Sequence, residues 1–351
     1  MKHPRTMLSW PRADEANPYV LRLVEALTRR GVRVRSGRYL AGLSVRPGAA
    51  RWLHLHWPEW MTHHPSRWRY HARTRWLLGL LDVARARGVR VAWTTHNLFG
   101  HDDPHPDLGS AARRSLLARC DVVFGHFPSA ERDVRGLGFE GRFALTPHPH
   151  YDDDYPRPFR DARERDDFRR SLGVRDGEVL VVSPGSMEPY KNLPRVARAL
   201  IDAGARGVRW IVAGRCRDAR ELEALRAVER ESPWVSVREG FVPRVELASL
   251  IAAADAALLG YRAFYTSGAA VLALTLETPV IGPPEHHLAT LTGEAFFIPL
   301  AAVDAPSMRA ALDRVRAITP AARARAREHS LRTGWDDVAR TVAATLWEGR
   351  P

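Results

Sequence analysis

Residues 183–192, with the sequence SPGSMEPYKN, carry the clearest indication of the fold. It follows the apolar run 178–183 (EVLVVS), which predicts a buried strand, and it precedes 193–200 (LPRVARAL), whose apolar spacing predicts a helix. Gly185 lets the backbone approach a ligand closely, and a helix start presents unpaired N–H groups to an anion. Lys191 adds a cation at the same place. This strand, loop and helix therefore predict a diphosphate site, and an ordinary turn is the alternative.

A second loop of the same kind spans residues 261–268 (YRAFYTSG). It follows an apolar strand and opens a helix that we expect over 269–276. Thr266 or Ser267 can cap this helix, and Gly268 leaves its first turn open to an anion. Two such helix starts on strands of one sheet predict a nucleotide-diphosphate site, although plain capping without a ligand is the alternative.

Strands and helices alternate along the chain on both sides of a polar connection at 151–170. This alternation is typical of parallel sheets covered by helices on both faces. We therefore predict an α/β protein of two Rossmann-like doubly wound domains that face a cleft, residues 1–155 and 156–351. The last helix, expected over 335–347, is a candidate to pack back on the N-terminal domain. Ligands of such sheets bind beyond the carboxyl ends of the strands.

The charge of the chain is unusual. Its 53 basic and 40 acidic residues give a formal net charge of +13, and 51 of the basic residues are Arg. No block of five or six consecutive basic residues occurs, so a basic arm is not expected. General preference for Arg accounts for most of the charge. In such a chain the internal Lys191 stands out, because Lys is a compact point charge that the planar fork of Arg does not replace. The alternative is that Lys191 remains by chance and has no special role.

Composition and termini exclude several classes. With 45% hydrophobic and 26% charged residues the chain is an ordinary globular protein, neither disordered nor collagenous. Cys120 and Cys216 are its two cysteines, which favours a reducing compartment. No signal peptide and no run of 18 apolar residues is present. We therefore expect a soluble, cytoplasmic protein, with peripheral contact on the inner face of an anionic membrane left open.

Segment 67–76 (RWRYHARTRW) interleaves arginines with aromatic residues. It could lie on an anionic membrane, bind single-stranded nucleic acid, or form a plain Arg-rich surface helix. Trp57 and Trp60 follow an apolar strand at 52–57 and could stack on a sugar or rest at a lipid interface.

The motifs in this order resemble those of GT-B fold glycosyltransferases, the group 1 and exopolysaccharide-type nucleotide-sugar transferases. Residues 185–192 resemble the family's G-x(5)-K-N loop, and a strand that ends in Gly214 follows. Residues 277–281 (ETPVI) resemble the family's G-x-P-V-I. In the N-terminal half, 54–58 (HLHWP) and 94–97 (TTHN) resemble its first strands. The resemblance covers nearly the whole chain.

The chain departs from the family at several positions. Counted back from Pro279, the two positions of the retaining Glu-x(7)-Glu motif hold Phe264 and Leu272. The Gly of G-x-P is Glu277, and the Arg that often follows the loop glycine is Ser186. The missing carboxylates leave contacts to the donor sugar and the stereochemistry open.

The resemblance implies a glycosyltransferase that moves a sugar from a nucleoside-diphosphate sugar to a saccharide, lipid-linked or small-molecule acceptor, without metal or cofactor. Lys191 and the helix starts would stabilise charge on the leaving phosphate. The donor-binding residues that we expect are Gly185, Ser186, Lys191, Asn192, Gly214, Arg215, Tyr261, Thr266, Ser267 and Gly268.

His96 is the second predicted catalytic residue, and it is one candidate for the base that an inverting reaction needs. Glu59, Asp14 and Glu15 are the others. The acceptor-binding residues that we expect are Asn17, Tyr19, Trp57, Glu59 and His126.

We expect no metal. His54 and His56 share one face of a strand and His63 follows, but no known zinc spacing is completed. Two other functions stay open: a GT-B sugar-nucleotide epimerase or phosphorylase, and a basic nucleic-acid-binding protein. Dispersed charge and the lack of a recognition motif count against the last, so we expect no nucleic acid as a partner.

Overall fold

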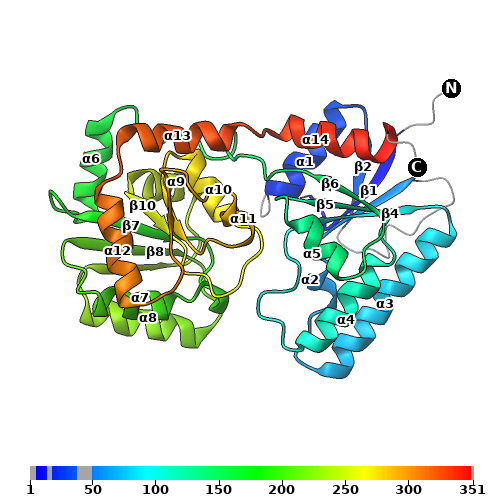
Figure 1. Cartoon of the computed structure of the whole chain (residues 1–351), viewed down its shortest axis with the longest axis horizontal. Helices are drawn as coiled ribbons and strands as arrows, with labels where there is room; N and C mark the ends of the chain where they lie inside the picture. The colour runs from blue at the N-terminus through cyan, green and yellow to red at the C-terminus, as the bar shows by residue number, and fades with distance from the viewer. Residues whose placement is uncertain (1–4, 14–17, 38–49, 349–351) are drawn as a thin grey trace. The chain divides into compact units, whose positions relative to one another are not determined.

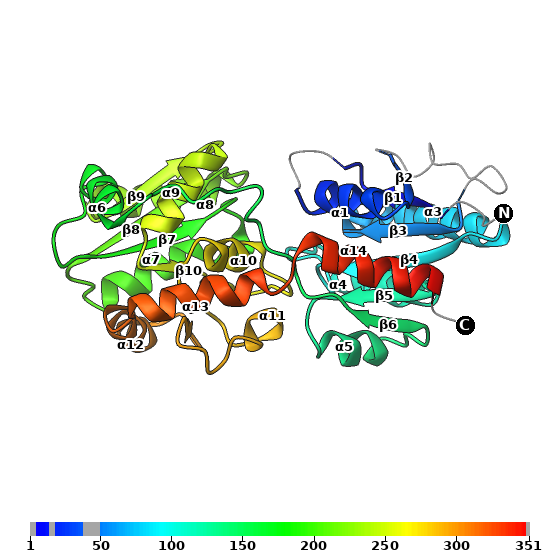
Figure 2. The ribbon, with the colours of Figure 1, turned by 90° about the horizontal axis from the view of Figure 1, so that it is seen from above.

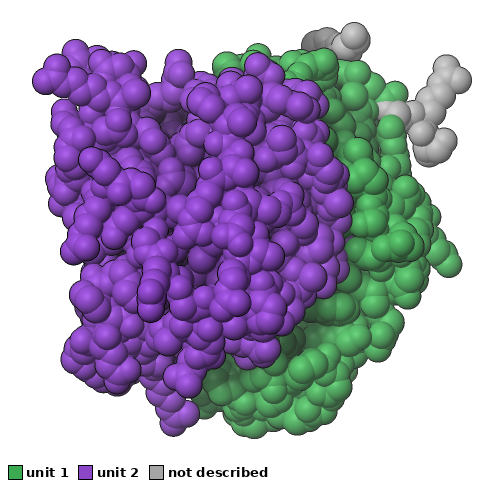
Figure 3. Space-filling model, turned by 60° about the vertical axis from the view of Figure 1, so that its left-hand side comes forward, with its two compact units in different colours: residues 1–148, 333–351 green, residues 149–332 purple. Residues whose placement is uncertain are grey.

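The computed structural model describes residues 5–13, 18–37 and 50–348, which form two compact units (Figure 1). Unit 1 consists of Met1–His148 and Thr333–Pro351, and unit 2 of Pro149–Arg332 (Figure 3). The units divide at His148, before the boundary that we expected at residue 155. The segment from Thr333, which contains the last helix, belongs to unit 1.

Unit 1 contains a parallel sheet with the strand order β2-β1-β3-β4-β5-β6. Its strands are β1 (Thr6–Trp10), β2 (Arg33–Ser36), β3 (Trp52–His56), β4 (Arg90–Thr95), β5 (Val122–Gly125) and β6 (Arg142–Leu145). Every residue of β1, β3 and β5 is buried, as expected for a parallel sheet that is covered on both faces.

Helices cover both faces of this sheet. They are α1 (Pro18–Arg29), α2 (Glu59–Thr62), α3 (Arg67–Ala86), α4 (Pro106–Leu117), α5 (Ala130–Gly136) and α14 (Trp335–Ala343), which continues into a π-helical turn at Ala344–Glu348. Helices α1 and α14 pack side by side (Figure 2). Helices α3 and α4 enclose the main core of unit 1, where Leu81 and Leu116 meet Leu55 and Trp93 of the sheet.

Unit 2 contains a second parallel sheet, with the order β12-β11-β10-β7-β8-β9. Its strands are β7 (Val179–Pro184), β8 (Val208–Gly214), β9 (Val235–Glu239), β10 (Ala256–Leu258), β11 (Val280–Gly282) and β12 (Phe297–Pro299). Residues alternate between its two faces, so Leu180 and Val182 enter one core while Val179 and Val181 enter the other.

The helices of unit 2 divide between these cores. They are α6 (Ala162–Ser171), α7 (Leu193–Asp202), α8 (Ala219–Glu231), α9 (Arg244–Ala253), α10 (Gly268–Thr275), α11 (His286–Ala289), α12 (Ala305–Arg316) and α13 (Pro320–Leu331), with a 3-10 turn at Pro189–Lys191. Helices α9, α10 and α13 contribute to the first core, and α7, α8 and α12 to the second.

Both sheets are doubly wound, as predicted. The chain builds β7, β8 and β9 outward in one direction and then returns to place β10 on the other side of β7. In unit 1 it likewise starts at β1, adds β2 on one side and β3 on the other. Each sheet therefore has a topological switch point, where neighbouring loops diverge and a ligand can enter. In unit 2 this point lies between β7 and β10, and in unit 1 between β1 and β3.

Candidate functional site

The two loops singled out in the sequence leave the sheet of unit 2 at its switch point. Ser183 near the end of β7 donates a hydrogen bond from Oγ to the carbonyl oxygen of Leu258 at 2.7 Å, which joins β7 to β10. Beyond this bond, Arg262 N donates to the Tyr190 carbonyl oxygen at 2.9 Å and links the two loops. The predicted diphosphate loop and the predicted second helix start are therefore neighbours in the structure.

Glycines let the backbones at this edge approach closely. Gly185 has a positive φ of 86°, which favours glycine. A Cβ on Gly214 would lie 2.4 Å from the carbonyl oxygen of Gly185, and one on Gly260 would lie 2.2 Å from Cγ2 of Val196. Both distances are shorter than any real contact, so neither position tolerates a larger residue unless the chain shifts.

Lys191 lies inside this loop. Its side chain is buried, and Nζ donates a hydrogen bond to the Pro184 carbonyl oxygen at 2.8 Å. A Cβ on Gly185 would lie only 3.1 Å from Nζ, so the ammonium sits directly over the glycine. Burial lowers the pKa of Lys191 to about 8, an effect that the nearby Glu188 opposes. A diphosphate placed here would restore the missing counter-charge.

The helix that follows Lys191 offers fewer donors than predicted. The chain first makes the 3-10 turn Pro189–Lys191, and α7 then begins after Asn192, whose positive φ of 61° is left-handed. Pro194 in the first turn of α7 has no N–H group. The Asn192 side chain donates to the Gly260 carbonyl oxygen at 3.2 Å. Lys191 is therefore the main charged donor of this loop.

The start of α10 fits an anion better. Ser267 caps the helix, because its Oγ accepts from Ala270 N at 3.1 Å and also lies 3.1 Å from the Tyr261 hydroxyl. Oγ1 of Thr266 is buried without a hydrogen-bond partner among the described residues. The first turn of a helix carries N–H groups that have no partner within the helix. The Thr266 hydroxyl and the first turn of α10 are together available to a ligand.

Two of the expected donor-binding residues lie on the surface. Ser186 and Arg215 are both exposed, and the Arg215 guanidinium lies over the Phe241 ring at 5.2 Å from its centroid. Sequence analysis missed His287, whose Nδ1 accepts from Ser267 N at 3.5 Å. No local pattern marks it, because it follows a different strand, β11.

The family positions that differ in this chain have structural explanations. Phe264 and Leu272, which replace the paired carboxylates, are both buried in the first core of unit 2. Glu277, which replaces a glycine, has a positive φ of 61°. Glycine is the usual residue in that conformation, so the family motif and the observed backbone agree although the side chain differs.

The corresponding edge of unit 1 contains a chain of histidines. His56 Nδ1 lies 3.0 Å from His96 Nε2, and His96 Nδ1 lies 3.2 Å from His126 Nε2. His126 Nδ1 ends the chain at 2.7 Å from the carbonyl oxygen of Thr146. Burial lowers the pKa of all three rings, that of His126 to about 4.

These contacts indicate which ring nitrogen carries hydrogen in each of the three histidines. The Thr146 carbonyl can only accept, so Nδ1 of His126 carries hydrogen, and the neutral ring accepts at Nε2. His96 then donates from Nδ1 and accepts at Nε2 from Nδ1–H of His56. The chain ends at His56 Nε2, a buried lone pair without a partner in the described part of the molecule.

His96 is therefore fully engaged. It is 5% exposed, and both of its nitrogens are bonded to other imidazoles. The Trp57 ring stacks on the His96 ring with their centroids 4.0 Å apart, and the Tyr19 ring lies nearly perpendicular to it with a centroid distance of 4.5 Å. The structure thus brings His96, His126, Tyr19 and Trp57 together, as the sequence grouped them. As a base His96 would first have to release the bond from His56.

Glu59 faces a different environment. Its carboxylate is 6% exposed, accepts from Asn97 Nδ2 at 3.0 Å and forms an ion pair with Arg113 at 3.3 Å. The Arg113 guanidinium also lies over the Trp93 ring at 4.3 Å. These contacts hold both oxygens inside unit 1, so the expected roles of Glu59 as a base or an acceptor ligand find no free oxygen.

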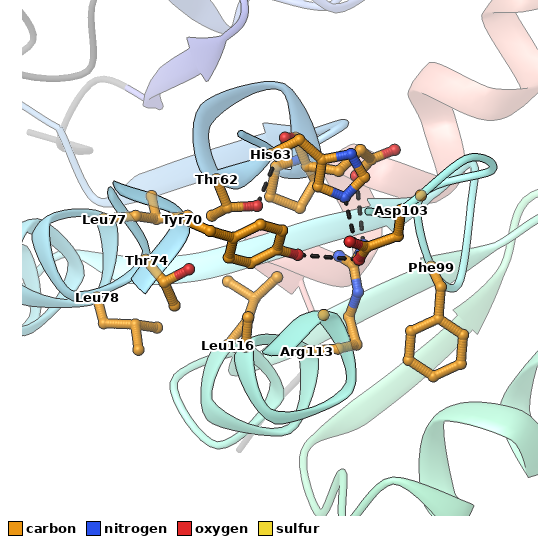
Figure 4. A pocket seen from close by; sticks show the side chains of 15 residues that line it. Thr62, His63, Tyr70, Thr74, Leu77, Leu78, Phe99, Asp103, Arg113 and Leu116 are labelled. Carbon is orange, nitrogen blue, oxygen red and sulfur yellow. Dashed lines mark hydrogen bonds and ion pairs between the residues drawn. The ribbon is translucent and has the colours of Figure 1, made fainter. Parts of the chain in front are cut away.

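Glu59 and Arg113 line a small cavity between α2, α3 and α4 (Figure 4). Across it, Asp103 accepts from the Tyr70 hydroxyl at 3.0 Å and lies 3.3 Å from His63 Nε2. The cavity has a volume of about 20 Å³, which is enough for a water molecule but not for a sugar. We therefore assign it no ligand.

Other predicted residues lie elsewhere. Asn17, Asp14 and Glu15 fall outside the described residues. Within the described ranges, no group of three or more His, Cys, Asp or Glu side chains is arranged to hold a metal ion. Among the helices that the structure describes, none is both long and apolar enough to cross a bilayer.

The chain resembles known proteins along most of its length. No protein-family model matches the chain. It is 25% identical over 315 residues to a GDP-mannose:glycolipid 4-beta-D-mannosyltransferase of Xanthomonas campestris, which covers 88% of this chain and 82% of that protein.

Among solved structures, a sucrose-phosphate synthase from Thermosynechococcus elongatus superposes with a TM-score of 0.76, 15% identity and 98% coverage of both chains. HepE of Anabaena in complex with UDP gives a TM-score of 0.71 and 12% identity, over 98% of this chain and all of that one. These structures share the fold that the motifs indicated. The chain is a glycosyltransferase with the GT-B fold.

Proposed function

We propose that unit 2 binds a nucleoside-diphosphate sugar at its switch point and that the sugar passes to a lipid-linked saccharide. The observation that carries this proposal is the buried ammonium of Lys191, placed over Gly185 beside the start of α10. The mannosyltransferase relative is named for GDP-mannose and a glycolipid, and this name supports the choice of donor and acceptor class.

The chemistry follows from charge. As the bond to the anomeric carbon breaks, negative charge grows on the leaving diphosphate. Lys191 Nζ donates one hydrogen bond to Pro184, and its other two N–H groups can turn to the phosphate oxygens. The partial positive charge at the start of α10 acts on the same group. Fixed donors of this kind stabilise the leaving group without a metal ion.

The acceptor end belongs to unit 1 in this proposal. Trp57 stacks on His96 there and is partly exposed, and an accessible aromatic ring is a usual platform for a sugar ring. Tyr19 is buried and supports His96 from within unit 1. His96 acts as the base only in a state in which its Nε2 no longer accepts from His56. Both cysteines are free, which supports a reducing, cytoplasmic setting, with the acceptor presented at the inner face of a membrane.

Thermal unfolding with a panel of ligands tests the donor. GDP, UDP and ADP, each alone and as the sugar conjugates GDP-mannose, UDP-glucose and ADP-glucose, are added separately to the full chain. We expect the ligands that carry one of the three nucleobases to raise the melting temperature, because a ligand that binds only the folded state stabilises it. That donor is then incubated with lipid-linked saccharides, and release of the nucleoside diphosphate is measured. If none of these ligands shifts the transition and none is turned over, the proposal is wrong.

A further inference from the structure

Helix α3 has two apolar faces. Its inner face packs Tyr70, Leu77, Leu81 and Ala84 into unit 1. Its outer face is unlike that of an ordinary surface helix, where polar residues cover the side away from the core.

The outer face carries a continuous apolar stripe. The stripe consists of Trp68, Ala72, Trp76, Gly79 and Val83, and every one of these residues is exposed. Their spacings of four, four, three and four residues keep them on one side of the helix. Trp68 is 69% exposed, Trp76 49% and Val83 47%. Two tryptophans on one stripe of one helix are costly to leave in water.

Basic residues flank this stripe. Helix α3 contains five arginines and one aspartate, a net charge of +4. Arg69 and Arg73 border one side, while Arg75 borders the other. Asp82 does not offset them, because Arg119 holds its carboxylate with two hydrogen bonds of 2.7 and 2.9 Å. Arg67 and Arg85 form ion pairs with Asp107 and Asp121. Arg69, Arg73 and Arg75 form no ion pair among the described residues, so the face combines exposed tryptophans with three arginines whose charge is not compensated.

This combination fits an anionic bilayer surface. Tryptophan rings favour the level of the lipid headgroups, and arginines reach the lipid phosphates from the flanks of the same helix. A second copy of this chain is disfavoured as the occupant, because two such faces, each bordered by Arg69, Arg73 and Arg75, would repel each other. A nucleic acid would bind the arginines through its phosphates, but it would make no favourable contact with the aliphatic and small residues Ala72, Gly79 and Val83.

We propose that the outer face of α3 docks the enzyme on an anionic membrane, with Trp68 and Trp76 inserted among the headgroups. This inference deepens the proposed function, since it names the surface that brings the enzyme to a lipid-linked acceptor. It does not depend on the donor site of unit 2.

Vesicle flotation tests the surface. The full chain is mixed with vesicles of phosphatidylcholine, with or without phosphatidylglycerol. We expect binding to the anionic vesicles and a loss of binding at high salt. Arg69→Glu with Arg75→Glu should weaken binding at least thirtyfold, since each basic residue near an anionic surface contributes about a factor of five. Trp68→Ser with Trp76→Ser should weaken it at least tenfold.

Matched controls separate this surface from net charge and from exposed apolar area. Arg163→Glu with Arg170→Glu removes the same charge from α6, a polar helix of unit 2. Phe241→Ser removes a ring of unit 2 that is 70% exposed. Both controls should bind vesicles nearly as the wild type does. Circular dichroism checks that each variant is folded. A further test needs no variant: vesicles that contain brominated lipids should quench the tryptophan fluorescence of the wild type.

Three results would contradict the proposed membrane surface. Equal losses in the α3 and α6 variants, no quenching by brominated lipid, or binding of a single-stranded oligonucleotide in place of vesicles would each overturn the docking surface. The α3 variants should keep the nucleotide-induced shift in melting temperature. A failed nucleotide shift thus counts against the proposed function, and failed flotation counts against the surface.

Discussion

The two switch points use the same topology in opposite ways. At the edge of unit 2, glycines and a helix start leave space and unpaired donors, and Lys191 brings a buried positive charge. At the edge of unit 1, histidine and aromatic side chains fill the corresponding place and satisfy one another. The edge of unit 2 therefore carries a buried positive charge, whereas the histidines at the edge of unit 1 are linked to one another by hydrogen bonds.

This difference has a physical basis. A diphosphate is recognised by backbone groups and charge, so its site needs small residues and an empty place. A neutral sugar hydroxyl is recognised by side chains, which must be held in position by other side chains. The two sites should therefore respond differently to acid and to substitution.

Acid should unfold unit 1 before unit 2. Burial lowers the pKa of His54 to about 3 and of His126 to about 4, and it lowers those of His56 and His96 well below the usual 6.5. Below pH 6.5 the unfolded chain therefore binds more protons, and the free energy of unfolding falls as the pH falls. Each ring contributes up to about 1.4 kcal/mol per pH unit, so pH 5 should cost unit 1 several kcal/mol.

Hydrogen exchange at pH 7.5 and pH 5, corrected for the intrinsic rate, measures this effect in the full chain. Peptides from β3 and β4 should lose protection at pH 5, while those from β7 and β8 keep it. Unit 2 serves as the internal control, because the four histidines named above all belong to unit 1, whereas burial lowers the pKa of His329 in unit 2. Equal loss in both units would show that the histidines of unit 1 are not held neutral.

Breaking the ion pair between Glu59 and Arg113 should have the second largest effect on stability. Arg113→Met leaves a buried carboxylate that keeps its hydrogen bond from Asn97 but loses its ion pair, which should cost about 3–5 kcal/mol of stability. The double variant Arg113→Met with Glu59→Gln should recover much of this loss, because no buried charge remains. Chemical denaturation measures both.

The same pair distinguishes a structural carboxylate from a catalytic one. If Glu59 only supports the fold, Glu59→Gln should keep most of the transfer rate per folded molecule. A large loss of transfer at unchanged stability would instead restore Glu59 as the base that the sequence suggested.

Much of unit 2 could be predicted from sequence. The loop after β7 and the start of α10 are local patterns of glycine, lysine and capping residues, and such patterns are visible in a single chain. The sequence did not indicate β1 or β2. Strand β2 (RVRS) lies at the edge of its sheet and has no buried residue, so its sequence contains no apolar run that would mark it as a strand.

Unit 1 was harder because its site depends on long-range contacts. The sequence grouped His96, His126 and Tyr19, but it could not show that three imidazoles bond in series. Nor could it show that Trp335 of α14 lies 5.3 Å from Tyr19, since more than 300 residues separate them. The carboxylate of Glu59 looked available at a strand end, and only the position of Arg113 on α4 shows otherwise.

Replacing Lys191 tests the proposed diphosphate site of unit 2 directly. Lys191→Ala should lower transfer by about 10²–10³-fold with the fold intact, because a fixed donor to the leaving group is lost. Lys191→Arg should not restore activity, since the position beside Gly185 is too confined for a planar fork. In the wild type, affinity for the nucleoside diphosphate should fall as the pH rises above about 8, where Lys191 loses its charge. Isothermal titration across this range should show no such fall in the Ala variant, and equal nucleotide-induced shifts in both proteins would contradict the role of Lys191.

The smallest effect concerns the cap of α10 and separates its two functions. Ser267→Ala should cost about 1 kcal/mol of stability, because Oγ no longer accepts from Ala270 N. Thr319→Ala is the matched control, since its Oγ1 caps α13 through a bond of 3.2 Å from Ala322 N. Both variants should lower the melting temperature by a similar amount. Only Ser267→Ala should also weaken binding of the nucleoside diphosphate, by a few-fold, because a frayed first turn no longer aims its N–H groups at the phosphate. Equal affinities in the two variants would mean that α10 closes a core and takes no part in binding the donor, and the open edge of unit 2 would then depend on Lys191 alone.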